Sequence, residues 1–130
     1  MKKIFVWDYD EESGTPSNRR LFLDTAPLYS EGVPDGATID DEGYLWTCIF
    51  DGHKIIRISP DAKVVKEIAM PVKRPTQPCW YGENLDEFLV TSASLDVNMT
   101  EWPLSGDIFW LKPGAKGQLK RKFKMHKKSA

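Results

Sequence analysis

KIIRISPD (Lys54–Asp61) occurs in related form at two other places in the chain, as KIFVWDYD (Lys3–Asp10) and as DIFWLKPG (Asp107–Gly114). Each copy is a short run rich in β-branched and aromatic residues that ends at a turn containing Asp, Pro or Gly, which is typical of a β-strand. The copies begin at residues 3, 54 and 107, so they lie 51 and 53 residues apart. Helical periodicity is nearly absent between them. The sequence therefore predicts an all-β protein with an internal repeat.

Further short runs between the copies complete units of four strands. We expect a first pair of strands at 3–9 and 21–24, four strands at 37–40, 44–49, 54–58 and 64–69, and four more at 77–81, 88–91, 107–111 and 119–124. A four-stranded unit that recurs every 40–50 residues or so is typical of β-propeller blades. The chain would then hold two full blades and the outer half of another.

An arc of blades leaves the blades at both of its ends without a neighbour on one side. A blade buries its two faces only against neighbouring blades, so an arc leaves a flat face and strand edges exposed. We therefore expect either association with an N-terminal half that this chain lacks, or a homo-oligomer in which two copies close the ring.

The composition fits one folded domain, with 130 residues of which 41% are hydrophobic and 12% aromatic. No stretch approaches the ~18 apolar residues of a membrane span, and no apolar signal region follows Lys2 and Lys3. We therefore expect a cytoplasmic protein with no membrane partner.

Cys48 and Cys79 lie far apart in apolar, strand-like segments, and we interpret them as reduced core residues rather than as a disulfide.

The net charge of −1 conceals an asymmetry. Residues 1–115 carry all 19 acidic and 11 of the 18 basic residues, whereas residues 116–130 carry the other seven basic ones. Such a basic end can steer a protein toward nucleic acid, or it can be a solvated last strand with a frayed terminus. We favour the second interpretation and expect no nucleic-acid partner, because an acidic body repels phosphate. The chain is divided into a partial propeller (1–125) and a basic tail (126–130).

An ordered series of short motifs runs through the middle of the chain. They are Pro34-Asp35-Gly36-Ala37-Thr38-Ile39-Asp40, Glu42-Gly43-Tyr44-Leu45-Trp46, Ser59-Pro60-Asp61, Arg74-Pro75-Thr76 and Leu89-Val90-Thr91-Ser92-Ala93. This series resembles the regucalcin, gluconolactonase and luciferin-regenerating enzyme family. Gln77 departs from the family pattern, in which a small polar residue is common. The resemblance implies a six-bladed propeller, of which the chain would form the C-terminal portion, about two and a half blades.

The resemblance also implies a hydrolase that opens sugar lactones such as gluconolactone with a divalent metal in the central channel. Calcium is the usual metal, with zinc, magnesium or manganese also accepted. The metal is held by a Glu, an Asn and the Asp of the Pro-Asp-Gly motif. Asp35 matches the last of these and is thus implied to be a metal ligand that also helps to activate the attacking water. The Glu and Asn positions would fall before Met1.

The residues themselves leave two interpretations of Asp35 open. Calcium binds six to eight oxygen atoms, usually including carboxylates, and Asp35 would point from a loop before strand 37–40 into the channel. Pro, Asp and Gly are also favoured in turns, so the motif could be a plain turn.

Asp40–Gly43 is interpreted as an exposed acidic hairpin turn. Five tryptophans are expected to pack mostly between blades, namely Trp7, Trp46, Trp80, Trp102 and Trp110.

Two functional hypotheses follow. The first is metal-dependent hydrolysis of a sugar lactone, either by this chain or by an enzyme of which it is a C-terminal fragment. The alternative is a non-catalytic propeller fragment that serves as a binding or self-assembly module. The alternative arises because two of the three family metal ligands have no counterpart in the sequence.

Overall fold

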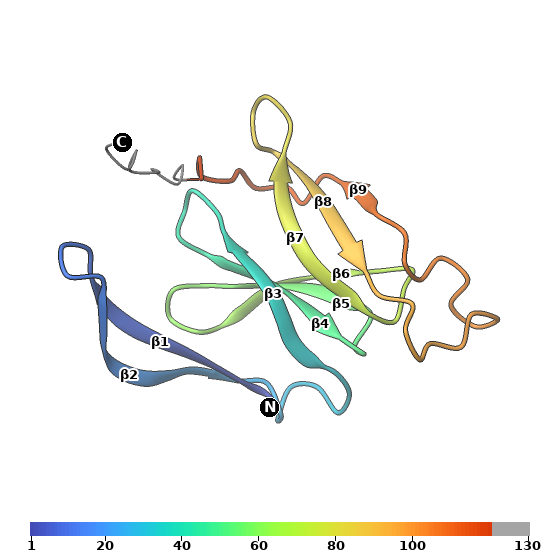
Figure 1. Ribbon diagram of the computed structural model, residues 1–130, viewed down its shortest axis with the longest axis horizontal. Helices are drawn as coiled ribbons and strands as arrows, with labels where there is room; N and C mark the ends of the chain where they lie inside the picture. The colour runs from blue at the N-terminus through green and yellow to red at the C-terminus, as the bar shows by residue number, and fades with distance from the viewer. Residues whose placement is uncertain (121–130) are drawn as a thin grey trace, which may run out of the picture.

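A computed structural model describes residues 1–120, and these residues form nine β-strands and no helix. The strands are β1 (Lys3–Asp10), β2 (Thr15–Asp24), β3 (Val33–Ile39), β4 (Leu45–Phe50), β5 (Lys54–Ile58), β6 (Val64–Ala69), β7 (Pro75–Tyr81), β8 (Glu87–Ser92) and β9 (Phe109–Leu111). They form three antiparallel sheets, β1-β2, β3-β4-β5-β6 and β7-β8-β9 (Figure 1). The prediction of an all-β protein is confirmed. Within this part of the chain, no helix could cross a membrane.

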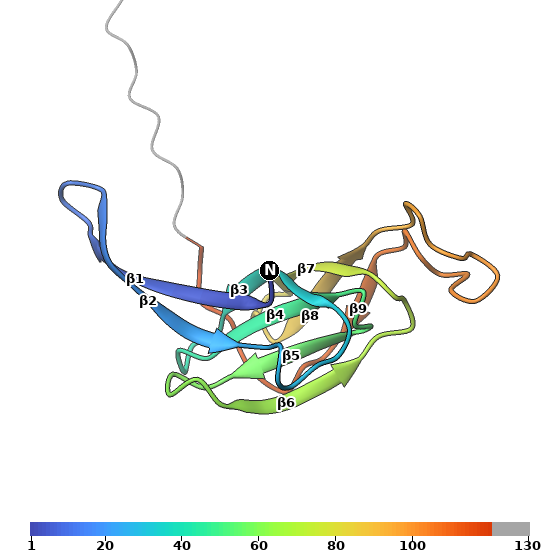
Figure 2. The same ribbon diagram turned by 90° about the horizontal axis from the view of Figure 1, so that it is seen from below.

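The repeat seen in the sequence marks the same position in each sheet. Its three copies supply β1, β5 and β9, and β5 is the third strand of the four-stranded sheet. β1 and β2 therefore correspond to the third and fourth strands of a blade, while β7, β8 and β9 correspond to the first three. The four-stranded sheet lies between the other two (Figure 2). This arrangement is a propeller arc of about two and a half blades, as the repeat predicts.

The strands at the two ends of the arc differ from the prediction. β2 begins at Thr15 rather than at residue 21, and it stays paired with β1 through two register shifts. Leu119 and Lys120 belong to no strand, although a strand was expected at 119–124. The remainder of that strand and the boundary between propeller and tail at residue 125 lie outside the described residues.

Residues 113–118, here called the crossing segment, follow β9 and run across the ends of the neighbouring strands (Figure 1). The Lys116 carbonyl accepts a hydrogen bond from the Asp41 amide at 2.8 Å. The Gly117 amide donates to the Leu85 carbonyl, also at 2.8 Å. Asp41 follows β3 and Leu85 precedes β8, so the crossing segment ties two sheets together at one end.

Gly117 lies directly against the indole ring of Trp80. A Cβ atom at residue 117 would lie 2.1 Å from Trp80 Cγ, which leaves no room for any side chain. The Trp80 indole nitrogen in turn donates to the Ile39 carbonyl at 3.0 Å. The ring therefore fixes both the end of β3 and the crossing segment.

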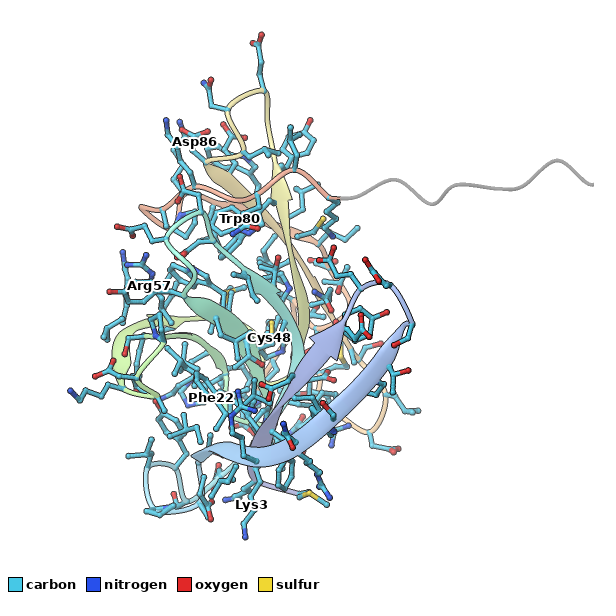
Figure 3. The ribbon with its side chains drawn as sticks, turned by 90° about the vertical axis from the view of Figure 1, so that its left-hand side faces the viewer. Lys3, Phe22, Cys48, Arg57, Trp80 and Asp86 are labelled. Carbon is cyan, nitrogen blue, oxygen red and sulfur yellow. The ribbon has the colours of Figure 1, made fainter. Side chains whose placement is uncertain are left out.

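The tryptophan layer fills the space between the second and third sheets. Its ring contacts are close and angled, with Trp46 and Phe88 centroids 5.2 Å apart at 85° and Trp80 and Phe88 centroids 4.2 Å apart at 42°. Figure 3 shows Trp80 and Cys48 in the interior. The buried members of the tryptophan layer are Trp46, Cys48, Ile55, Met70, Val72, Trp80, Phe88 and Val90.

The isoleucine layer lies between the first and second sheets and is thinner. Its fully buried members are Ile49, Ile56 and Ile58, and partly buried side chains such as Ile4 and Phe22 pack on them from β1 and β2. β4 is buried on both faces because it contributes to both layers. The expectation that tryptophans pack between blades holds for Trp46 and Trp80. Trp7 and Trp110 instead lie on the outer faces of the first and third sheets and are 45% and 57% exposed.

The hairpin predicted at Asp40–Gly43 is exposed except at its first residue. Asp40 is fully buried, and its side-chain Oδ1 accepts hydrogen bonds from the amides of Glu42 and Tyr44 at 3.1 and 2.9 Å. Its Oδ2 accepts from Trp46 Nε1 and Arg57 Nε, both at 2.9 Å. Every lone-pair direction of this carboxylate is therefore used by the fold, so the interpretation of Asp40 as a surface residue was wrong.

Burial by itself would raise the pKa of Asp40. The hydrogen bonds from Trp46, Tyr44 and Arg57, together with the guanidinium charge, outweigh that effect and hold the pKa below its usual 3.8. Asp40 therefore stays ionised as the anchor of the first turn of the second sheet.

Candidate functional site

Asp35 lies inside β3, at a β-bulge. Pro34 pairs with Ile49 and Ala37 pairs with Thr47, so Asp35 and Gly36 together stand opposite one residue of β4. We expected Asp35 to lie in a loop before a strand at 37–40, but the strand begins at Val33 and the bulge accommodates the extra residue. The motif is thus part of a bulged strand and not a plain turn. Bulges commonly redirect a side chain near functional sites.

β3 is an edge strand of its sheet, and the Asp35 side chain is exposed. The neighbouring edge is β7, the first strand of the third sheet, and the two strands run side by side (Figure 1). In a blade the first strand is the innermost one, so both strands line the same inner surface. Asp35 therefore presents its carboxylate at the inner surface of the arc.

A buried hydroxyl group holds the bulge in place. Thr47 is 1% exposed, and its Oγ1 lies 3.1 Å from the Asp35 carbonyl and 3.3 Å from the Gly36 carbonyl. These are the carbonyls that the bulge removes from regular pairing with β4. The Thr47 hydroxyl thus provides a hydrogen-bond donor for the carbonyls at the bulge and fixes the backbone that carries Asp35. The sequence signal was a threonine within the otherwise apolar run Trp46–Phe50, and we did not recognise it.

Gly36 is required by the close approach of β7. A Cβ atom at residue 36 would lie 2.4 Å from the Thr76 carbonyl oxygen and 2.2 Å from the side-chain oxygen of Gln77. The glycine therefore lets the two inner strands meet beside Asp35. This packing explains the third residue of the Pro34-Asp35-Gly36 motif without any reference to a turn.

Cys48, opposite the bulge, is fully buried. Burial, assisted by the negative charge of Asp35, raises the pKa of the Cys48 thiol to about 12. The thiol is therefore protonated at neutral pH and does not serve as a nucleophile. Both cysteines are free thiols, as the sequence predicted, but only Cys48 is a buried core residue, whereas Cys79 is partly exposed.

The donor set around Asp35 is composed of oxygen. Within residues 1–120, no group of three or more His, Cys, Asp or Glu side chains could hold a metal ion by itself. Asp35 supplies one carboxylate, and Gln77 on the adjoining strand supplies a carboxamide oxygen beside Gly36. These groups fit part of the six to eight oxygen ligands of calcium. The sequence flagged Gln77 as a departure from the family pattern but did not identify it as a site residue.

Comparison with known protein families identifies the family of the chain. The sequence model of the SMP-30/Gluconolactonase/LRE-like region matches residues 1–94. The chain belongs to this family. Among curated relatives, it is 38% identical over 102 residues to 6-deoxy-6-sulfogluconolactonase from Pseudomonas putida, a match that covers 76% of this chain and 35% of that protein. It is 37% identical over 112 residues to regucalcin from Xenopus laevis, covering 82% of this chain and 36% of that protein.

Solved structures agree with the fold. A luciferin-regenerating enzyme superposes with a TM-score of 0.86 at 32% sequence identity, covering 95% of this chain and 42% of that one. Regucalcin from Agrobacterium tumefaciens, described as a calcium-binding protein, superposes with a TM-score of 0.87 at 24% identity, covering 95% and 43%. The second match supports the fold alone. The chain spans about a third of the length of the curated relatives it matches.

Proposed function

We propose that this family member acts in the metal-dependent hydrolysis of a sugar lactone in the cytoplasm, with Asp35 as a ligand of a divalent metal. Calcium is the metal we favour, with zinc, magnesium and manganese as alternatives. The observation that carries the proposal is the position of Asp35. It lies at a bulge on an innermost strand, exposed at the inner surface, in the motif that resembles the family's metal-binding motif.

The chemistry assigned to Asp35 follows from its carboxylate. A divalent metal at this place would polarise the lactone carbonyl and stabilise the oxyanion that develops there. The Asp35 carboxylate would help to hold that metal and accept a proton from the attacking water as general base. Thr47 and Gly36 would keep the carboxylate in position. The resemblance assigns the other ligands to a Glu and an Asn in segments that this sequence does not contain.

Hydrolysis of gluconolactone, followed by acid release with and without added calcium, tests this proposal. We expect turnover that requires calcium, and we expect Asp35→Ala to lower kcat/KM by about 100-fold or more. Asp41→Asn is the matched control, because Asp41 is an exposed carboxylate beyond the far end of β3. Turnover that survives both a chelator and Asp35→Ala would refute the role of Asp35.

A second candidate function is a non-catalytic self-assembly module, and the outer faces of the first and third sheets favour it. Trp7 and Tyr9 on β1 are exposed, and the Arg19 guanidinium lies 3.9 Å from the centre of the Phe5 ring on the same sheet. Trp110 on β9 is exposed at the other end of the arc. In a propeller such faces pack against neighbouring blades.

Association with a second copy, or with a separate propeller half, would cover these faces. Light scattering measures the molar mass of the chain in solution, and we expect a dimer that Trp110→Glu converts to a monomer. Absence of lactone turnover together with a stable dimer would favour this function over catalysis. A wild-type monomer that remains soluble would argue against it.

A further inference from the structure

Gln77 is an exposed polar residue on the inner strand adjacent to Asp35. It lies on β7, whose edge runs beside that of β3, and its side chain extends across to the neighbouring strand. The side-chain Nε2 donates to the Ala37 carbonyl at 3.1 Å and to the Pro78 carbonyl at 2.8 Å. Gln77 therefore links the inner strands of two sheets at the level of the bulge.

These two hydrogen bonds fix the orientation of the carboxamide. An amide nitrogen has two hydrogens and both are used here, while a flipped amide would place its oxygen against two carbonyl oxygens. Within residues 1–120, the side chain of Gln77 forms hydrogen bonds through its nitrogen, and its Oε1 accepts none. The structure therefore holds the Gln77 side-chain oxygen in a defined direction, with no protein donor bonded to it within residues 1–120.

This oxygen lies directly beside the residue that follows Asp35. A Cβ atom on Gly36 would come within 2.2 Å of Gln77 Oε1, so the absence of a side chain at residue 36 makes the space that the oxygen occupies. Asp35 and Gln77 are both exposed, and the strands that carry them, β3 and β7, contact each other. A carboxylate and an oriented amide oxygen are thus carried on adjoining strands, each with its backbone fixed by packing.

We propose that Gln77 Oε1 and the Asp35 carboxylate are two ligands of one hard divalent cation, Ca²⁺. The proposal rests on the proposed function, in which Asp35 is a metal ligand. Both ligands are oxygen, which is the donor preferred by calcium, whereas zinc favours imidazole nitrogen and thiolate sulfur. Cys48 is fully buried in the tryptophan layer, and the partly exposed thiol of Cys79 lies two residues along β7 from Gln77 and belongs to neither of the two proposed ligands. The pair should therefore select Ca²⁺ over Zn²⁺.

Nuclear magnetic resonance of the ¹⁵N-labelled full chain, titrated with calcium chloride, reports on each ligand without requiring catalysis. We expect the side-chain NH₂ signals of Gln77 and the backbone amides of Asp35 and Gly36 to shift with one common dissociation constant. Gln118 supplies an internal reference, because it is the other glutamine of the chain and its Nε2 donates to the Asp40 carbonyl. A parallel titration with zinc chloride should give smaller shifts at these positions.

Gln77→Met removes the oxygen while preserving the length of the side chain, and Gln77→Ala removes the whole group. Each variant should weaken calcium affinity, as reported by the Gly36 amide signal, by about tenfold. Gln118→Ala should leave this affinity unchanged. Wild-type affinity in folded Gln77→Met and Gln77→Ala would overturn the role of Gln77 and leave Asp35 as a ligand. If the Asp35 and Gly36 amides do not respond to calcium, the proposed metal site fails, and the pairing fails with it.

Discussion

The two layers that cover the middle sheet differ in how completely they are filled. The tryptophan layer has eight buried residues and is closed at one end by the crossing segment. The isoleucine layer has three, and an apolar cleft of about 360 Å³ remains between β1, β2 and the β3–β4 hairpin. Three strands cover one face of the sheet, whereas two strands cover the other. Within residues 1–120, the face covered by three strands is therefore the more completely buried one.

This difference has a consequence for local stability. Regions with few buried apolar contacts open more readily than the global core. β1 and β2 rest on the thinner layer, and most of β2 is exposed. The inner surface with Asp35 and Gln77 lies over the tryptophan layer, where β3 and β7 meet. The candidate site is thus built on the more stable part of the arc.

The largest expected effect comes from truncating a phenylalanine in each layer. Phe88 is fully buried between Trp46 and Trp80, and Phe88→Ala should reduce the free energy of unfolding by about 3–5 kcal/mol. Phe22 is partly buried in the isoleucine layer, and Phe22→Ala should cost about 1–2 kcal/mol. Urea denaturation of both variants measures the difference. Equal losses would show that the first sheet is as firmly packed as the third.

A smaller effect is expected at Asp40, which anchors the end of the tryptophan layer. Its two carboxylate oxygens accept four hydrogen bonds. Asn has only one acceptor oxygen, so in Asp40→Asn the side-chain NH₂ group would face N–H donors with no acceptor between them. We expect a loss of about 3 kcal/mol at neutral pH. Glu42→Gln is the control, because Glu42 is the exposed partner of Arg57 and should contribute less than about 1 kcal/mol.

The same variant has a defined pH dependence. The pKa of Asp40 is lower in the folded protein than the ordinary value of 3.8, so its contribution to stability is fully present above that value. The contribution disappears as the pH falls through the folded-state pKa. The stability difference between wild type and Asp40→Asn should therefore be constant from pH 5 to 7 and shrink in more acidic solution, where Asp40 becomes protonated. A difference that grows on acidification would contradict this assignment.

Much of this architecture could be predicted from the sequence. The three related stretches beginning at residues 3, 54 and 107 gave the correct blade repeat, because β-branched runs and turn residues act locally. The burial of Asp40 could not be predicted in this way. Its partner Arg57 is 17 residues away, and an Asp-Asp-Glu-Gly string by itself is typical of an exposed turn.

The candidate site was predictable in its identity but not in its geometry. The motif resemblance pointed to Asp35, whereas the bulge depends on a β4 hydroxyl, Thr47, and on the approach of β7 to Gly36. Both are contacts between strands distant in sequence, so no local pattern encodes them. The crossing segment was missed for the same reason. A strand was expected at 119–124, but the segment just before it is held by Gly117 against Trp80, which lies 37 residues earlier in the sequence.

The smallest expected effects compare two glycines at the same end of the two layers. Gly117→Ala would force a methyl group into the Trp80 ring and should cost about 1–3 kcal/mol. Gly43 lines the cleft of the isoleucine layer, with φ at +83° and open space beside it, so Gly43→Ala should cost about 1 kcal/mol through backbone strain. Trp80→Ala separates the two causes, because it removes the Cγ and Cδ atoms that clash with a methyl group at residue 117 and cannot relieve strain at Gly43. A double-mutant cycle by thermal denaturation should therefore give coupling between residues 80 and 117 and none between residues 80 and 43.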